Sequence, residues 1–219
     1  MILYAFLFAM QAQSAPPVSD PRPTPWPEPE RELRLAGKFE DANSPQARRE
    51  LEEWAGCVAR KSPGEAGRVL AMDFTSGAYG RALRMLSESD RDCVRFRGTI
   101  RSAGLLFAGE LAETLLESDD NPMVRRLTLA AALPAAQSYS FTDKVAICVV
   151  RSVPNDVAGL FATTRGSAEE TGVLEALATP MAMCAQAAGA KKQLAVNPAG
   201  LRAMLATASY RSVADRKDV

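Results

Sequence analysis

The sequence predicts an all-α protein built from two tandem copies of one multi-helix repeat. Three observations point to this class. Helix start signals are several times as frequent as strand signals along the chain. The four cysteines form two pairs with the same separation of 36 positions, Cys57 with Cys93 and Cys148 with Cys184. The string C-V-x-R-x-x-P also occurs twice, starting at Cys57 and again at Cys148, which indicates an internal duplication at an offset of 91 positions.

The duplication also predicts how the cysteines pair. At this offset, nine of the 37 positions from 57 to 93 are identical in the second copy. Four cysteines allow three pairings, and the duplication favours Cys57–Cys93 with Cys148–Cys184, because each repeat then closes on itself. A shared zinc site is the alternative, but the sequence has no histidine and no C-x-x-C pair. One arrangement open to such a protein packs the two repeats about a pseudo-twofold axis.

The N-terminal residues 1–14 are typical of a secretory signal peptide. Nine apolar residues, Ile2–Met10, precede a small-x-small site at Ala12 and Ser14, although no basic residue comes before the apolar run. A buried N-terminal helix is the alternative. Nine residues are too few to span a bilayer, which needs about 20. The sequence therefore predicts an exported protein, periplasmic or secreted, with no membrane span.

Residues 15–30 are rich in proline and are expected to form a linker or a strap anchored by Trp26. The first repeat is expected at 31–117. Ser44-Pro45 predicts the start of a helix through Arg60, and Ser62-Pro63 predicts a second start. Ser76 is expected to cap a third helix, and the segment 102–117 has the strongest helical periodicity in the chain.

A polar break opens an expected connector at 118–140, and the second repeat is expected at 141–211. Its predicted helices run from about Phe141 to Arg151, from Pro154, from Ser167 with a capping box, and from Asn197-Pro198 to about Tyr210. The residues 212–219 are expected to form a polar tail. The β-branched run from Val145 to Val150 and the residues 94–97 argue mildly for strand.

Composition excludes several classes of function. The chain has 26 basic and 26 acidic residues, which gives no basic excess for nucleic-acid binding. The absence of histidine removes Ser–His, Cys–His and His-ligated metal mechanisms. No cofactor motif is present, so we expect neither a cofactor nor a metal.

The carboxylates that remain include Glu110 and Glu113, which are spaced to lie side by side on a helix. Such a pair could act as a general acid and its partner. The simpler interpretation, which we favour, places Glu110, Glu113 and Glu117 on the solvated face of an amphipathic helix.

Arg60 and Arg151 are the candidate ligand-binding residues, because both repeats keep an arginine at this place. Each falls in the last turn of a predicted helix, where a guanidinium can bond the terminal carbonyls and complement the helix dipole. We expect this capping role. In the sharper alternative, the two arginines converge on one anionic ligand.

The overall pattern resembles a group of exported alphaproteobacterial proteins of the sphingomonad type that have no known activity. The short signal, the proline-rich start, the repeated C-V-x-R string and the segment Leu105–Glu113 carry this resemblance. It implies export and a duplicated helical fold. It implies no activity, cofactor or site.

These observations predict a non-enzymatic binding or structural module of the periplasm or cell surface, whose partner is an envelope protein or an anionic ligand. The alternative function is a carboxylate-dependent hydrolase that acts on a cell-wall polymer. A deep cleft lined by two acidic residues would favour the enzyme, whereas an apolar surface would favour the binding module.

Overall fold

The computed structural model describes residues 44–94, 104–191 and 194–214, and within these ranges every regular element is a helix. This confirms the predicted all-α class. The predicted signal peptide and proline-rich linker lie outside the described residues. The helices are α2 (Pro45–Lys61), α3 (Pro63–Leu70), α4 (Gly77–Ser89), the 3-10 helix η1 (Arg91–Cys93), α5 (Leu105–Glu117), α6 (Met123–Ala132), α7 (Phe141–Ser152), α8 (Pro154–Phe161), α9 (Ala168–Ala176), α10 (Ala178–Ala187) and α11 (Pro198–Ala214).

Short polar side chains start the helices where the sequence predicts them. The hydroxyl oxygen of Ser44 accepts a hydrogen bond from the backbone of Ala47, and Ser76 and Ser167 cap α4 and α9 in the same way. The side chain of Asn197 accepts from the backbone N–H of Gly200 at the start of α11. Each cap satisfies a backbone N–H that has no partner within its helix.

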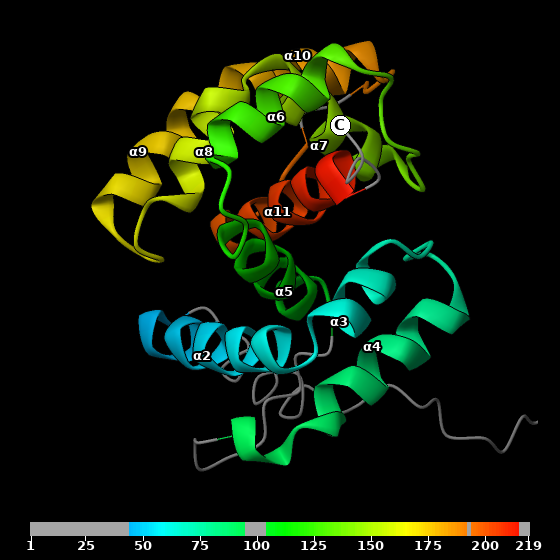
Figure 1. Cartoon of the computed structure of the whole chain (residues 1–219). Coiled ribbons are helices and arrows are strands. Elements are labelled where there is room, and N and C mark those ends of the chain that lie inside the picture. The colour runs from blue at the N-terminus through cyan, green and yellow to red at the C-terminus, as the bar shows by residue number, and fades with distance from the viewer. Residues whose placement is uncertain (1–43, 95–103, 192–193, 215–219) are drawn as a thin grey trace, which may run out of the picture. The chain divides into compact units, whose positions relative to one another are not determined.

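Helices α5 and α11 pack against each other in the middle of the described region (Figure 1). Helices α2 and α3 contact α5, while α7, α6 and α8 contact α11. Buried apolar residues from both predicted repeats form one hydrophobic cluster, in which the ring of Trp54 on α2 lies 4.6 Å from that of Phe107 on α5. The two halves therefore share a single core.

The close approach of α5 and α11 depends on a glycine. A Cβ atom at Gly109 would lie 2.6 Å from the Cα atom of Ala203, closer than two carbon atoms can pack. Because backbone atoms stand on the far side of this contact, a larger side chain would force the helices apart.

Both predicted disulfides are present. Cys57 is bonded to Cys93 and Cys148 to Cys184, with Cα–Cα distances of 5.6 and 5.8 Å. The first bond joins α2 to η1, and the second joins α7 to α10.

The helix boundaries follow the offset of 91 positions. Helix α3 runs from 63 to 70 and α8 from 154 to 161, and the capping residues Ser76 and Ser167 are separated by the same offset. The residues before α3 and α8, Ser62 and Val153, also share one backbone conformation, with φ of −130° and −136°. These correspondences support the duplication, which stays a prediction.

Several elements differ from expectation. The expected connector 118–140 contains the helix α6, and the run from Val145 to Val150 is helical within α7. The third helix of the second half breaks at Leu177 into α9 and α10. The physical reason is Pro180, which has no N–H to bond the carbonyl oxygen four residues earlier. Helix α11 continues to Ala214, beyond the start of the expected polar tail.

Candidate functional site

Two of the three glutamates on the expected solvated face of the segment 102–117 are not solvated. Glu113 is only 1% exposed, and Glu110 is largely buried, while Glu117 is exposed. Leu105, the first residue of α5, is 45% exposed. The reason is tertiary: α5 lies between α2 and α11, so nearly its whole circumference is covered. A helix covered on several sides has no solvated face along its middle, and water reaches mainly the residues at its two ends.

Glu113 is paired with an arginine that is equally buried. The guanidinium of Arg202, on α11, donates two hydrogen bonds to the Glu113 carboxylate and one of 3.0 Å to Glu170. Its remaining bonds go to the side chain and carbonyl of Thr163 and to the carbonyl of Phe161. Arg202 is 2% exposed, so its charge is stable there only because carboxylates and carbonyls replace the water.

A second arginine extends this network toward α2. Arg165, in the turn before α9, donates from Nε to both oxygens of Glu110, at 3.0 and 2.8 Å. Its other nitrogens lie 2.8 Å from Glu52 on α2 and 3.0 Å from Glu113. Arg165 therefore joins three carboxylates from two helices.

The third arginine, Arg48 on α2, makes a two-pronged pair with Glu170 at 2.7 and 2.8 Å. In a capping box, Glu170 would accept from the N–H of Ser167, but it accepts instead from the N–H of Gly166 at 2.7 Å. Gly166 has a φ of +76°, which a residue with a Cβ adopts only with strain. The turn thus aims the Glu170 carboxylate at the arginines.

We call these seven residues the charge network: Arg48, Glu52, Glu110, Glu113, Arg165, Glu170 and Arg202. It connects α2 and α5 of the first half to α9, α11 and the turn at 162–167 of the second half. Three guanidinium groups face four carboxylates, so one negative charge is left over when all seven groups are ionised.

Glu110 is the carboxylate best placed to take up a proton. Burial, with smaller contributions from the negative charges of Glu113 and Glu52, raises its pKa from 4.5 to about 7 against the opposing effect of Arg165. Burial also acts on Glu170, but hydrogen bonds from Arg48 and Gly166 outweigh it and lower that pKa to about 2.

The raised pKa of Glu110 predicts that the stability of the folded protein depends on pH. Because its pKa is about 7 in the folded chain and 4.5 ordinarily, the folded state binds more protons between these values, and stability should fall as pH rises through this window. Glu110→Gln does not titrate, so it should gain stability relative to the wild type between about pH 4.5 and 7. Urea unfolding of both proteins across this range measures the difference. Glu53→Gln, at an exposed site on α2, controls for the substitution, and a pH-independent difference for Glu110→Gln would contradict the assignment.

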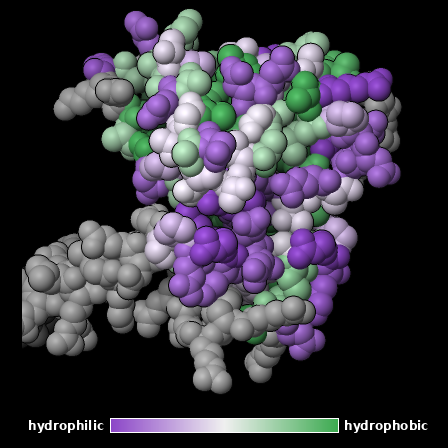
Figure 2. All heavy atoms as spheres, turned by 90° about the vertical axis from the view of Figure 1, so that its left-hand side faces the viewer, coloured by the Kyte–Doolittle hydropathy of each residue, from purple (hydrophilic) through white to green (hydrophobic). Residues whose placement is uncertain are grey.

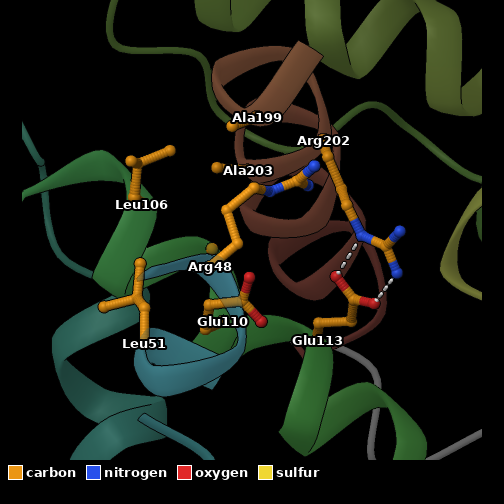
Figure 3. Close-up of a pocket in the computed structure, with 9 residues that line it drawn as sticks. Arg48, Leu51, Leu106, Glu110, Glu113, Ala199, Arg202 and Ala203 are labelled. Atoms are coloured by element: carbon orange, nitrogen blue, oxygen red, sulfur yellow. Dashed lines mark hydrogen bonds and ion pairs between the residues drawn. The ribbon is translucent and has the colours of Figure 1, made fainter. Parts of the chain in front are cut away.

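A small pocket opens beside the charge network. Figure 3 shows Arg202 and Glu113 facing each other from α11 and α5, with Arg48 and Glu110 to one side of this pair. The pocket has a volume of about 10 Å³, which is room for about one water molecule. A sugar ring or peptide cannot enter it, so Glu110 and Glu113 do not line a substrate cleft.

A second cluster of charged and aromatic side chains surrounds Arg211 on α11. The guanidinium of Arg211 lies 5.6 Å from the ring centre of Phe74 and 5.4 Å from that of Tyr139, and it pairs with Asp143. At the offset of 91 positions, Arg48 and Glu52 correspond to Tyr139 and Asp143, and Arg165 corresponds to Phe74. In both clusters the start of one half's first helix meets the turn before the other half's third helix, as pseudo-twofold packing would require.

The two candidate arginines have different surroundings. Arg151 donates to the carbonyls of Ala130 and Leu133, at 3.2 and 2.6 Å, so it bonds the end of α6 rather than that of its own helix. Arg60 is exposed at the end of α2, with its guanidinium close to Gly56 and no bond to a helix-end carbonyl among the described contacts. No described contact brings the two arginines to a shared partner.

A larger pocket lies among α3, α5, α6 and α11, and we call it the α6 groove. Its volume is about 850 Å³. The groove is lined by the start of α3, the ends of α5 and α11, and α6: Pro63, Gly64, Leu115, Ser118, Asp119, Asn121, Arg125, Arg126, Leu129, Ala130, Ala132, Leu133, Tyr210, Val213 and Ala214. Neither Arg60 nor Arg151 lines it. On the face of the molecule shown in Figure 2, apolar residues are interspersed with hydrophilic ones.

Among the described residues, no group of His, Cys, Asp or Glu is arranged to hold a metal, and no helix is long and apolar enough to cross a membrane. Comparison with protein families, curated proteins and solved structures finds no match to this chain. The resemblance to sphingomonad-type exported proteins therefore stays a prediction.

Sequence reasoning missed the three arginines of the charge network and the whole α6 groove. One signal was available for Arg202, which interrupts an otherwise small and apolar stretch of α11 from Leu201 to Ala206. A charged side chain on the buried side of a helix is costly unless an opposite charge from elsewhere in the fold pairs with it.

Proposed function

We propose that this protein is an exported, non-enzymatic binding module that takes a small, largely apolar ligand in the α6 groove. The size of the groove and the exposed leucines in its lining support this proposal. Its volume of about 850 Å³ lies within the range of small-molecule sites, about 300–1,000 Å³. Leu129 and Leu133 are 56% and 37% exposed on its α6 side, and burying them under a ligand would be favourable.

The rival function, a carboxylate-dependent hydrolase, is less well supported. The paired carboxylates Glu110 and Glu113 lie in the charge network, beside a pocket that has room for about one water molecule. The α6 groove is large enough for a substrate, but Asp119 is the one acidic residue in its lining, and Asp119 is paired with Arg126 at 3.4 Å. The first place has two acidic residues but no room for a substrate, and the second has room but one acidic residue. Export is supported by the two disulfides, which are typical of oxidising compartments, together with the predicted signal peptide.

A neutral, environment-sensitive dye such as Nile red tests the groove. We expect the native protein to bind one dye molecule per chain with saturable fluorescence. Leu129→Lys and Leu133→Lys should each weaken this binding at least tenfold, because a lysine places a charge in the apolar wall.

Two other exposed apolar residues provide matched controls. Met85→Lys on α4 and Met183→Lys on α10 replace side chains that are 69% and 65% exposed and that do not line the groove. Both should bind the dye as the wild type does. Unsaturable binding, or equal losses in all four variants, would show that the groove is not a ligand site.

A further inference from the structure

We propose that the ligand of the α6 groove is an amphiphile with a single aliphatic chain and an anionic head group that pairs with Arg125. This inference rests on the proposed function and specifies the ligand's chemistry. It follows from the charges at the groove and from the character of its walls.

The charges in the groove lining favour an anion. The lining contains Arg125, Arg126 and Asp119, which leaves one positive charge in excess. Arg126 is committed to the protein, because it donates to the carbonyls of Leu116 and Asn121 and pairs with Asp119.

Arg125 lies next to it on α6 and is exposed, and among the described contacts it has no ion pair. Its guanidinium is therefore the group available to a ligand's negative charge. An anionic head would need no rearrangement of the Arg126 contacts.

The walls of the groove favour an aliphatic chain. Leucine, valine, alanine and proline side chains predominate in the lining, and Tyr210 is the one aromatic residue there. Stacking of a flat aromatic ligand would call for more aromatic partners. A flexible alkyl chain, in contrast, can bend along the apolar side chains that α3, α6 and α11 contribute to the lining.

Displacement of the neutral dye by alkyl probes tests the inference, with all probes kept below their critical micelle concentrations. Dodecanoate should displace the dye with one molecule per chain. Decanoate and octanoate should bind progressively more weakly, by about fourfold for each methylene removed, since a buried methylene contributes about 0.8 kcal/mol. Dodecyltrimethylammonium has the opposite charge and an alkyl chain one methylene longer than that of dodecanoate, and it should still displace the dye less effectively than dodecanoate.

Arg125 variants test the head group. Arg125→Gln should weaken dodecanoate binding by up to about fivefold, the range of an exposed ion pair. Arg125→Glu should reverse the preference, so that dodecyltrimethylammonium displaces the dye better than dodecanoate. Arg84→Glu is the matched control, because Arg84 is an exposed helical arginine outside the groove. Dye binding itself should persist in all of these variants.

Three results would overturn the inference. The first is equal displacement by the anionic and cationic probes in the wild type. The second is an equal effect of Arg125→Glu and Arg84→Glu. The third is dodecanoate binding that appears only in a variant whose chain ends at Ala214, because this would mean that the last residues of the full chain occupy the groove. Because the neutral dye reports on the groove without a head group, failure of the anion preference leaves the proposed function standing.

Discussion

Replacing Arg202 with methionine should destabilise the folded protein by about 3–5 kcal/mol, the cost of removing one partner from a buried ion pair. Arg202 is 2% exposed and bonds both Glu113 and Glu170, which are 1% and 2% exposed. Methionine has a similar length but no charge, so two guanidinium groups would remain for four carboxylates. The free energy of unfolding from urea titration at neutral pH measures the effect.

Two controls separate the loss of pairing from the loss of packing. Arg84→Met changes an exposed arginine on α4 and should alter stability by less than about 0.5 kcal/mol. The double variant Glu113→Met with Arg202→Met removes both members of the pair, so it should cost less than the sum of the two single variants. If Arg202→Met and Arg84→Met are equally stable, the charge network does not hold the two halves together.

Removing either disulfide should cost about 4 kcal/mol, and the two costs should be nearly equal. In the chain-entropy treatment the effect depends on the number of residues in the closed loop, and both bonds join cysteines 36 positions apart. The paired variants Cys57→Ala with Cys93→Ala, and Cys148→Ala with Cys184→Ala, are compared by urea unfolding under oxidising conditions.

The comparison also tests whether the two halves are energetically equivalent. Cys93 and Cys184 are buried to a similar degree, at 3% and 4% exposure, so the packing lost with each sulfur should be similar. A large inequality between the two double variants would mean that local packing, rather than loop closure, sets the contribution of each bond. If neither double variant loses a measurable part of the free energy of unfolding, the disulfides do not stabilise the fold.

The sequence by itself determined the helical class, most helix starts and the cysteine pairing, because these depend on residues close together or on a repeated spacing. Ser44, Ser76 and Ser167 each cap a helix through a backbone group three residues away, so the signal and its partner lie in the same short segment. The disulfides follow from the equal separation of the two cysteine pairs. Even the break at Leu177 has a local cause in Pro180.

Only the tertiary structure decided where the charges lie. Glu113 meets Arg202 across 89 positions and Arg48 meets Glu170 across 122, and no periodicity in one helix identifies such a partner. The same applies to the α6 groove, which forms from four helices that are separate in the sequence. A helical pattern shows which side of a helix is polar. Whether that side faces water or a matching charge depends on which other helices pack against it.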